Sequence, residues 1–289
     1  MLLKRHCGVI VPMVTPFAQD GTIDEGAVRR LVENLITGGV DGIFVLGTTG
    51  EVASISIADR LKLVLATIHA AAGRTPIYAG ISGNCLQESI DAAQRYELLG
   101  VHAAVAHAPA YYPVPDGDLE KYFGSMAEKI DLPLLIYNIP KVTHLSLPLD
   151  LIERLSHHPN IEGVKDSAAD GQRLIDLLRR VGRRDNFSVL CGCGTLFSEA
   201  LKLGADGVVP SSANLVPELY HAMWKASLQG QWEEVDRQQK LSTSAGDRYQ
   251  HGRTLGESLA ALKALLSAKG VCGPTVLPPL RTLSPEECP

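Results

Sequence analysis

Short apolar runs alternate along most of the chain with stretches in which apolar residues recur every three or four positions. The run Ile43-Phe44-Val45-Leu46 has no polar alternation, which is typical of a parallel strand buried on both faces. The stretch from 57 to 72 places Leu61, Val64 and Ile68 on one face, as in an amphipathic helix. Eight runs are predicted as strands: 9–14, 43–46, 76–81, 103–106, 134–137, 161–165, 187–191 and 207–209.

Helical stretches separate these predicted strands from one another. Eight strand–helix units predict an α/β fold, a closed (β/α)8 TIM barrel. The alternative is a doubly wound open sheet, which usually has fewer strands and a Gly-x-Gly-x-x-Gly turn after the first strand; no such turn follows here. After Ser211 the pattern is helical only, and the first of these helices can complete the barrel. We therefore predict a catalytic barrel domain at 1–225 and a C-terminal helical extension at 226–289.

Composition and charge narrow the classes of partner. The 289 residues carry a formal net charge of −5 with both signs interspersed, which predicts neither a nucleic-acid nor a membrane partner. The apolar runs are too short to span a bilayer, and no apolar signal region follows the first charges, so we expect a cytoplasmic protein. The six cysteines are scattered, and Cys191-Gly192-Cys193 is the one close pair. Without a second pair at ligand spacing, we expect no metal ion.

Polar residues follow several predicted strands at their carboxyl ends, where TIM barrels collect their catalytic groups. This set contains hydroxyls and one amine, but no group of metal ligands. A lysine amine attacks a ketone in its neutral form, which burial favours, and the Schiff base then serves as an electron sink. The pattern thus suits covalent amine catalysis. The residues are Thr48, Thr49, Tyr111, Tyr112, Tyr137 and Lys165.

Each of these residues also has a structural interpretation. A lysine at a strand end is usually solvated or ion-paired, and Asp166 is available to pair with Lys165. Tyr137 can pack at the barrel mouth, Thr48-Thr49 can cap a turn, and Tyr111-Tyr112 can line a loop or a subunit contact. Catalysis is favoured because four independent features fall on one face of the predicted barrel.

Four motifs occur in an order and spacing that resemble one enzyme family. They are Gly47-Thr48-Thr49-Gly50-Glu51, Ala110-Tyr111-Tyr112, Leu135-Ile136-Tyr137-Asn138-Ile139-Pro140 and Gly163-Val164-Lys165-Asp166. Over about residues 5–280 the chain resembles the dihydrodipicolinate synthase / N-acetylneuraminate lyase family. The resemblance implies a class I Schiff-base aldolase or lyase on a TIM barrel, working on pyruvate and an aldehyde without a cofactor. It also implies a homotetramer built as a dimer of dimers.

The resemblance assigns roles on the pyruvate side of the pocket. Lys165 matches the lysine that forms the Schiff base, and Tyr137 matches the tyrosine that shuttles protons. Thr49 and Tyr112 match the proton relay, with Tyr112 expected to reach across the tight-dimer interface. Thr48 and Thr49 match the turn that holds the pyruvate carboxylate.

The acceptor side departs from the best-known members. Gly192 matches the glycine that faces the pocket after strand seven. Val142 stands where dihydrodipicolinate synthases carry the arginine that grips aspartate semialdehyde. Gly194 and Thr195 replace the acidic pair with which N-acetylneuraminate lyases hold sugar hydroxyls. His144 is the residue that we expect to supply polar contacts to the acceptor.

These matches predict a lyase, a pyruvate-dependent aldolase acting on a 2-keto-3-deoxy sugar acid or a similar 2-oxo acid. One alternative is a 4-hydroxy-tetrahydrodipicolinate synthase, which Val142 disfavours. A second is a Schiff-base dehydratase of a keto-deoxy sugar acid. A third, from another functional class, is a non-catalytic paralogue that binds a 2-oxo acid; the complete lysine, tyrosine and threonine set argues against it.

Overall fold

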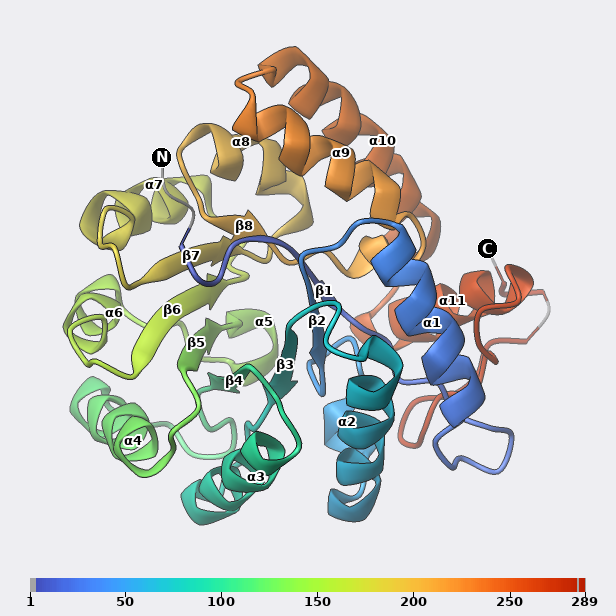
Figure 1. Cartoon of the computed structure of the whole chain (residues 1–289), viewed down its shortest axis with the longest axis horizontal. Coiled ribbons are helices and arrows are strands. Elements are labelled where there is room, and N and C mark those ends of the chain that lie inside the picture. The colour runs from blue at the N-terminus through green and yellow to red at the C-terminus, as the bar shows by residue number, and fades with distance from the viewer. Residues whose placement is uncertain (1–3, 285, 289) are drawn as a thin grey trace. The chain divides into compact units, whose positions relative to one another are not determined.

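Eight parallel strands close into a barrel in sequence order in the computed structural model, which describes residues 4–284 and 286–288 (Figure 1). The predicted TIM barrel with C-terminal helices is therefore confirmed. The strands are β1 (Gly8–Pro12), β2 (Gly42–Val45), β3 (Ile77–Gly80), β4 (Ala103–His107), β5 (Leu134–Asn138), β6 (Ile161–Asp166), β7 (Ser188–Cys191) and β8 (Gly207–Val208).

Helices separate the strands and continue after the last one. The α-helices are α1 (Glu25–Thr37), α2 (Ile57–Ala71), α3 (Leu86–Leu98), α4 (Asp116–Lys129), α5 (Pro140–Thr143), α6 (Leu149–Leu155), α7 (Gly171–Val181), α8 (Phe197–Lys202), α9 (Pro217–Leu228), α10 (Trp232–Gln250) and α11 (Leu255–Ala268). Short 3-10 helices are η1 (Val52–Ser54), η2 (Gly194–Leu196) and η3 (Ser211–Asn214). The pattern of apolar residues did not predict α5, because four residues are too few for a helical repeat to show.

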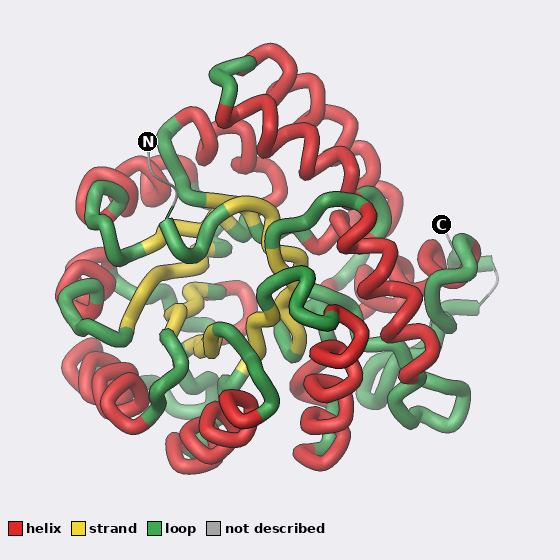
Figure 2. The backbone as a smooth tube through the Cα atoms, in the orientation of Figure 1, coloured by secondary structure: helices red, strands yellow, loops and turns green. Residues whose placement is uncertain are grey.

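The chain forms two compact units, one comprising the chain up to Val9 with Tyr78–Val209, the other Ile10–Ile77 with the chain from Pro210 onward. In the first unit the strands lie inside and helices such as α4 and α7 lie outside (Figure 2). Gly163 lets β6 approach its neighbours, because a Cβ there would lie 2.7 Å from both Leu135 Cδ2 and the Ser188 carbonyl oxygen.

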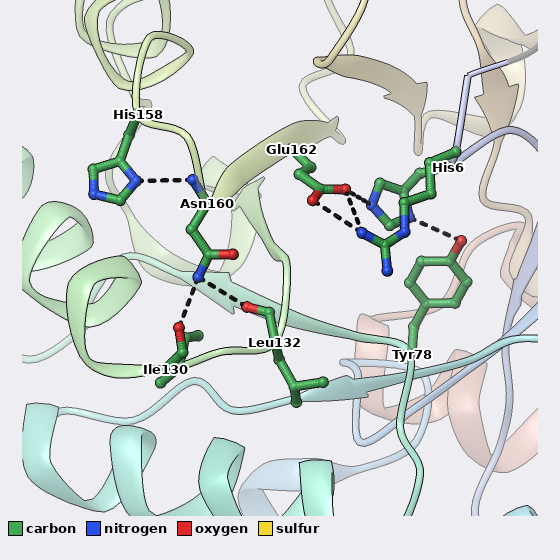
Figure 3. A network of polar contacts seen from close by, with 8 residues as sticks. His6, Tyr78, Ile130, Leu132, His158, Asn160 and Glu162 are labelled. Carbon is green, nitrogen blue, oxygen red and sulfur yellow. Dashed lines mark hydrogen bonds and ion pairs between the residues drawn. The ribbon is translucent and has the colours of Figure 1, made fainter.

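Polar contacts fix the amino ends of the strands in this first unit (Figure 3). His6 is buried, with Nε2 2.9 Å from Glu162 Oε2 and Nδ1 3.2 Å from the Tyr78 hydroxyl. The Asn160 side chain donates to the carbonyl oxygens of Ile130 and Leu132, drawn in Figure 3, and also to that of Ala127. The amino end of β6 is thus held by these contacts, and the residues at its carboxyl end take no part in them.

In the second unit, α1 packs on α2, and α10 packs on both α9 and α11. The first strand ends at Pro12 and not at Val14 as predicted, because the Val14 amide donates to Asn214 Oδ1 at 3.1 Å. Asn214 in turn donates to the Pro12 carbonyl at 3.0 Å. The Asn214 side chain therefore makes the hydrogen bonds that a neighbouring strand would otherwise make at this point.

The predicted domain boundary between residues 225 and 226 stays a prediction. None of the helices in the described ranges is long and apolar enough to cross a membrane.

Candidate active site

Lys165 and Tyr137 lie side by side at the carboxyl ends of β6 and β5. The strand register pairs the two residues directly, and Lys165 Nζ lies 3.8 Å from the centroid of the Tyr137 ring. The residues are only 6% and 5% exposed. The Lys165 amine thus lies against the ring of Tyr137, whose hydroxyl belongs to the same aromatic side chain. Both side chains lie in a place largely closed to water. This is the arrangement that covalent amine catalysis with a proton shuttle requires.

Asp166 is bound by groups other than Lys165. Its Oδ2 pairs with Arg173 on α7 at 2.9 Å and accepts from Asn138 Nδ2 at 3.0 Å, and its Oδ1 accepts from the Ala168 amide at 2.9 Å. Successive strand residues point to opposite faces, so Asp166 and Asn138 lie on the side facing α7 while Lys165 and Tyr137 share the other. This outer network ties the ends of β5 and β6 together and fixes the register of the reactive pair.

Gly192 lies directly beside Lys165. A Cβ at this position would collide with Ser167 Oγ and lie 3.1 Å from Lys165 Cε. A side chain here would therefore displace the Ser167 hydroxyl and press against the lysine side chain. The preceding residue, Cys191, is not a nucleophile, because burial raises the pKa of its thiol to about 12.

His107 is a member of this cluster that the sequence did not predict as a site residue. It ends β4, pairs in register with Tyr137, and its ring lies edge-to-face with the tyrosine at 6.4 Å between centroids. Its Nδ1 lies 2.7 Å from the carbonyl oxygen of Ala108 and so carries the hydrogen in the neutral ring. Nε2 is then a hydrogen-bond acceptor. No simple spacing links His107 to Lys165 in the sequence, and only the register of β4, β5 and β6 brings them together.

The pKa of His107 should report on the charge of Lys165. It lies below the ordinary value of 6.5, mainly because burial disfavours the imidazolium; the hydrogen bond to Ala108 opposes this shift, and the Lys165 ammonium adds to it. Removing that positive charge makes protonation easier, so in Lys165→Ala the titration midpoint of His107 should rise. NMR titration of the imidazole measures this midpoint, and an unchanged or lower value would contradict the proximity of the two charges.

Thr48 and Thr49 belong to the turn after β2, in the second unit, and both are half-buried. Within the turn, the Gly50 amide donates to the Gly47 carbonyl at 3.0 Å, and the Glu51 amide donates to the Thr48 carbonyl at 3.1 Å. The amides of Thr48 and Thr49 have no acceptor among the residues that the structure describes. Two adjacent amides and two hydroxyls form the kind of concave donor set that binds a carboxylate.

Tyr112 lies on an exposed segment between β4 and α4. It is 71% exposed and stacks edge-to-face on Tyr111, itself 75% exposed, with 4.9 Å between ring centroids. Two adjacent exposed tyrosines are typical of a contact surface. The structure therefore does not bring Tyr112 into the Lys165–Tyr137 cluster of its own chain.

The predicted acceptor residues lie on two short helical turns. Val142 is half-buried on α5, and His144 caps that helix with a left-handed backbone, φ 56°, and an exposed side chain. Gly194 and Thr195 lie on η2 and are exposed. No three side chains of His, Cys, Asp or Glu in the described part of the chain are placed to hold a metal ion.

Comparison with known proteins gives one family. A sequence model of the dihydrodipicolinate synthetase family matches residues 5–289. A probable 2-dehydro-3-deoxy-D-pentonate aldolase of Escherichia coli, YjhH, is 32% identical over 265 residues, covering 91% of this chain and 82% of the relative. The 4-hydroxy-tetrahydrodipicolinate synthase of Thiobacillus denitrificans is 34% identical, covering 77% of this chain and 75% of the relative.

Comparison with solved structures gives the same family as the sequence comparison. The dihydrodipicolinate synthase of Bacteroides thetaiotaomicron superposes with a TM-score of 0.92 at 33% identity, covering 99% of this chain and 96% of the other. Escherichia coli YagE, solved in complex with pyruvate, superposes with a TM-score of 0.93 at 28% identity, covering 98% and 95%. With a match that extends over nearly its whole length, the chain belongs to the dihydrodipicolinate synthetase family, whose members are aldolases and lyases.

Proposed function

We propose that the chain is a pyruvate-dependent aldolase that forms a Schiff base on Lys165 and cleaves or joins a carbon–carbon bond. The observation that carries this proposal is the buried pair of Lys165 and Tyr137, with Nζ 3.8 Å from the ring centroid. A protein that only binds a 2-oxo acid has no need to hold an amine and a phenol together in a closed site.

In the cleavage direction, the Lys165 amine attacks C2 of the 2-oxo acid to give a carbinolamine. Tyr137 donates its phenol proton to the carbinolamine hydroxyl, which leaves as water and gives the iminium. The resulting phenolate accepts the proton of the C4 hydroxyl, the C3–C4 bond breaks, its electron pair moves into the enamine, and the aldehyde leaves. Tyr137 then returns this proton to C3 of the enamine, and hydrolysis of the iminium releases pyruvate, restores the amine and gives a proton back to Tyr137.

The remaining roles on the pyruvate side follow the family resemblance. Thr48 and Thr49 hold the pyruvate carboxylate, supported by their two available amides. Thr49 and Tyr112 relay protons to Tyr137, with Tyr112 supplied by a neighbouring subunit of a homotetramer. The exposure of Tyr112 in the single chain supports this assignment, because a residue that completes a partner's site must face outward. The free cysteines suit a reducing compartment, and we propose a cytoplasmic location.

On the acceptor side we propose a 2-keto-3-deoxy sugar acid or a similar 2-oxo acid as the substrate. Val142 provides no charge for the carboxylate of aspartate semialdehyde, which disfavours a 4-hydroxy-tetrahydrodipicolinate synthase. The exposed His144 offers a polar contact for a hydroxylated acceptor. The similarity to YjhH, a probable 2-dehydro-3-deoxy-D-pentonate aldolase, supports this substrate class.

Borohydride reduction in the presence of pyruvate tests the proposal. The reduced imine is stable, so peptide mass analysis should find one pyruvate-derived adduct, on Lys165. Lys141, an exposed lysine on α5, serves as an internal control and should stay unmodified. An adduct on Lys141 alone, or no adduct on any lysine, would overturn the proposal.

The substrate is then identified by product analysis with a panel of acids. We expect turnover of a 2-keto-3-deoxy sugar acid to pyruvate and an aldehyde, and slower turnover of N-acetylneuraminate and of aspartate semialdehyde with pyruvate. Loss of water without release of pyruvate would instead indicate the dehydratase. Turnover of aspartate semialdehyde above the sugar acids would indicate the synthase.

A further inference from the structure

A buried ion pair lies at the end of the turn that carries Thr48 and Thr49. Glu51, the last residue of the turn, pairs through Oε1 with Lys263 of α11. Glu51 is 4% exposed and Lys263 0% exposed. A fully buried lysine is rare, and the mechanism proposed above uses neither residue.

Each member of the pair also holds the segment that follows α11. Lys263 Nζ donates to the Thr275 carbonyl at 2.7 Å, and Glu51 Oε2 accepts from the Leu277 amide at 3.0 Å. The ammonium lies 4.2 Å from the centroid of the Phe17 ring. Burial lowers the pKa of Lys263, and the Glu51 carboxylate opposes that shift. The pair thereby joins the turn, α11 and the segment at 275–277.

The backbone of the turn is strained at both ends. Leu46 and Glu51 have φ angles of 59° and 58°, in the left-handed region that side chains other than glycine avoid. Such residues persist only where their surroundings fix them. Glu51 is fixed by backbone hydrogen bonds to Thr48 and Ser54 and, through its carboxylate, by the Leu277 amide and Lys263. No hydrogen bond reaches Oε1 within the described residues, so this oxygen depends on the Lys263 charge.

Stability alone is a weak explanation for such a pair. Removing two charges from water costs several kcal/mol for each ion, and an apolar pair of similar volume is often as stable or more stable. A charged pair therefore points to a requirement for one defined geometry at Glu51.

We propose that the Glu51–Lys263 pair is a positioning device that holds the amides and hydroxyls of Thr48 and Thr49 in place for the substrate carboxylate. This assignment rests on the proposed function of the turn. It makes Lys263, on a helix of the predicted C-terminal extension, a determinant of pyruvate affinity that contacts no reacting atom.

Lys263→Met should raise the concentration of pyruvate that half-saturates adduct formation on Lys165 about tenfold or more, while the adduct still forms at saturation. Amide hydrogen exchange should become faster in the peptide containing residues 47–51. Lys4→Met is the matched control, because Lys4 also forms a buried ion pair, with Asp206 at 3.1 Å, in the other compact unit. Both variants should lose thermal stability, but only Lys263→Met should change the response to pyruvate.

A double variant, Lys263→Met with Glu51→Gln, separates positioning from stability. This double variant leaves no unpaired buried charge, so its thermal stability should recover. The pyruvate concentration that half-saturates adduct formation should nevertheless stay raised. A folded variant that binds pyruvate like the unmodified protein would overturn the positioning role alone. If neither variant folds, the pair is structural and the assignment fails. If the unmodified protein forms no adduct, the proposed function fails first.

Discussion

Replacing Lys165 with alanine should reduce both adduct formation and turnover to the background rate. The Schiff-base route passes through this amine at every step, so no other group of the cluster can substitute for it. The effect should appear in kcat, because the rest of the pocket still binds the 2-oxo acid. Steady-state turnover and borohydride trapping of the same preparation measure the two consequences independently.

Two variants control this experiment. Lys165→Met keeps an unbranched side chain against the Tyr137 ring, so its inactivity would reflect the lost amine and not lost packing. Lys141→Ala removes an exposed lysine of α5 and should leave both signals intact. Substantial turnover by Lys165→Ala would show that the reaction does not use this Schiff base.

Tyr137→Phe should lower kcat by a factor of about 10² to 10⁴, the range expected for the loss of a general acid–base group. The ring stays, so the contact with Lys165 Nζ and the edge-to-face contact with His107 are kept. Only the hydroxyl is lost, and with it the group proposed to accept the proton of the C4 hydroxyl. The adduct should still form, more slowly, because the lysine remains in place.

Tyr78→Phe is the matched control for this substitution. Tyr78 is also a buried strand tyrosine, 3% exposed, but its hydroxyl contacts His6 among the polar residues at the amino ends of the strands. Its loss should cost stability without a comparable loss of kcat. Equal losses of kcat in the two variants would mean that Tyr137 acts through packing and not through its hydroxyl.

The barrel could be predicted from sequence because parallel strands buried on both faces form continuous apolar runs. The end of β6 was predicted at Lys165, one residue short of the observed end at Asp166. The predicted end of β1, at Val14, lies two residues beyond the observed end at Pro12. Met13 and Val14 are apolar like the strand, so the sequence does not indicate that the Val14 amide bonds to Asn214. Apolar patterning identifies burial but not the partner of each backbone amide.

The parts of the candidate site that could be predicted are those marked by their position at the end of a strand. Lys165 and Tyr137 each end a strand, so strand counting places them at the same edge. The sequence makes Asp166 available to pair with Lys165, but in the structure Asp166 pairs with Arg173 because adjacent strand residues face opposite sides. His107 and Lys263 left no signal, since their neighbours lie far along the chain and only the folded structure brings them together.

The short turns α5 and η2 have a consequence for how such an enzyme diversifies. Lys165 and Tyr137 are carried by buried strands, whereas Val142, His144 and Thr195 lie on or directly after helical turns of three or four residues. The side chains of these three residues are exposed or half-buried. Exchanging these residues disrupts few buried contacts. If the proposed function holds, a gene duplicate can acquire a new acceptor by a few point mutations while it inherits the pyruvate chemistry unchanged.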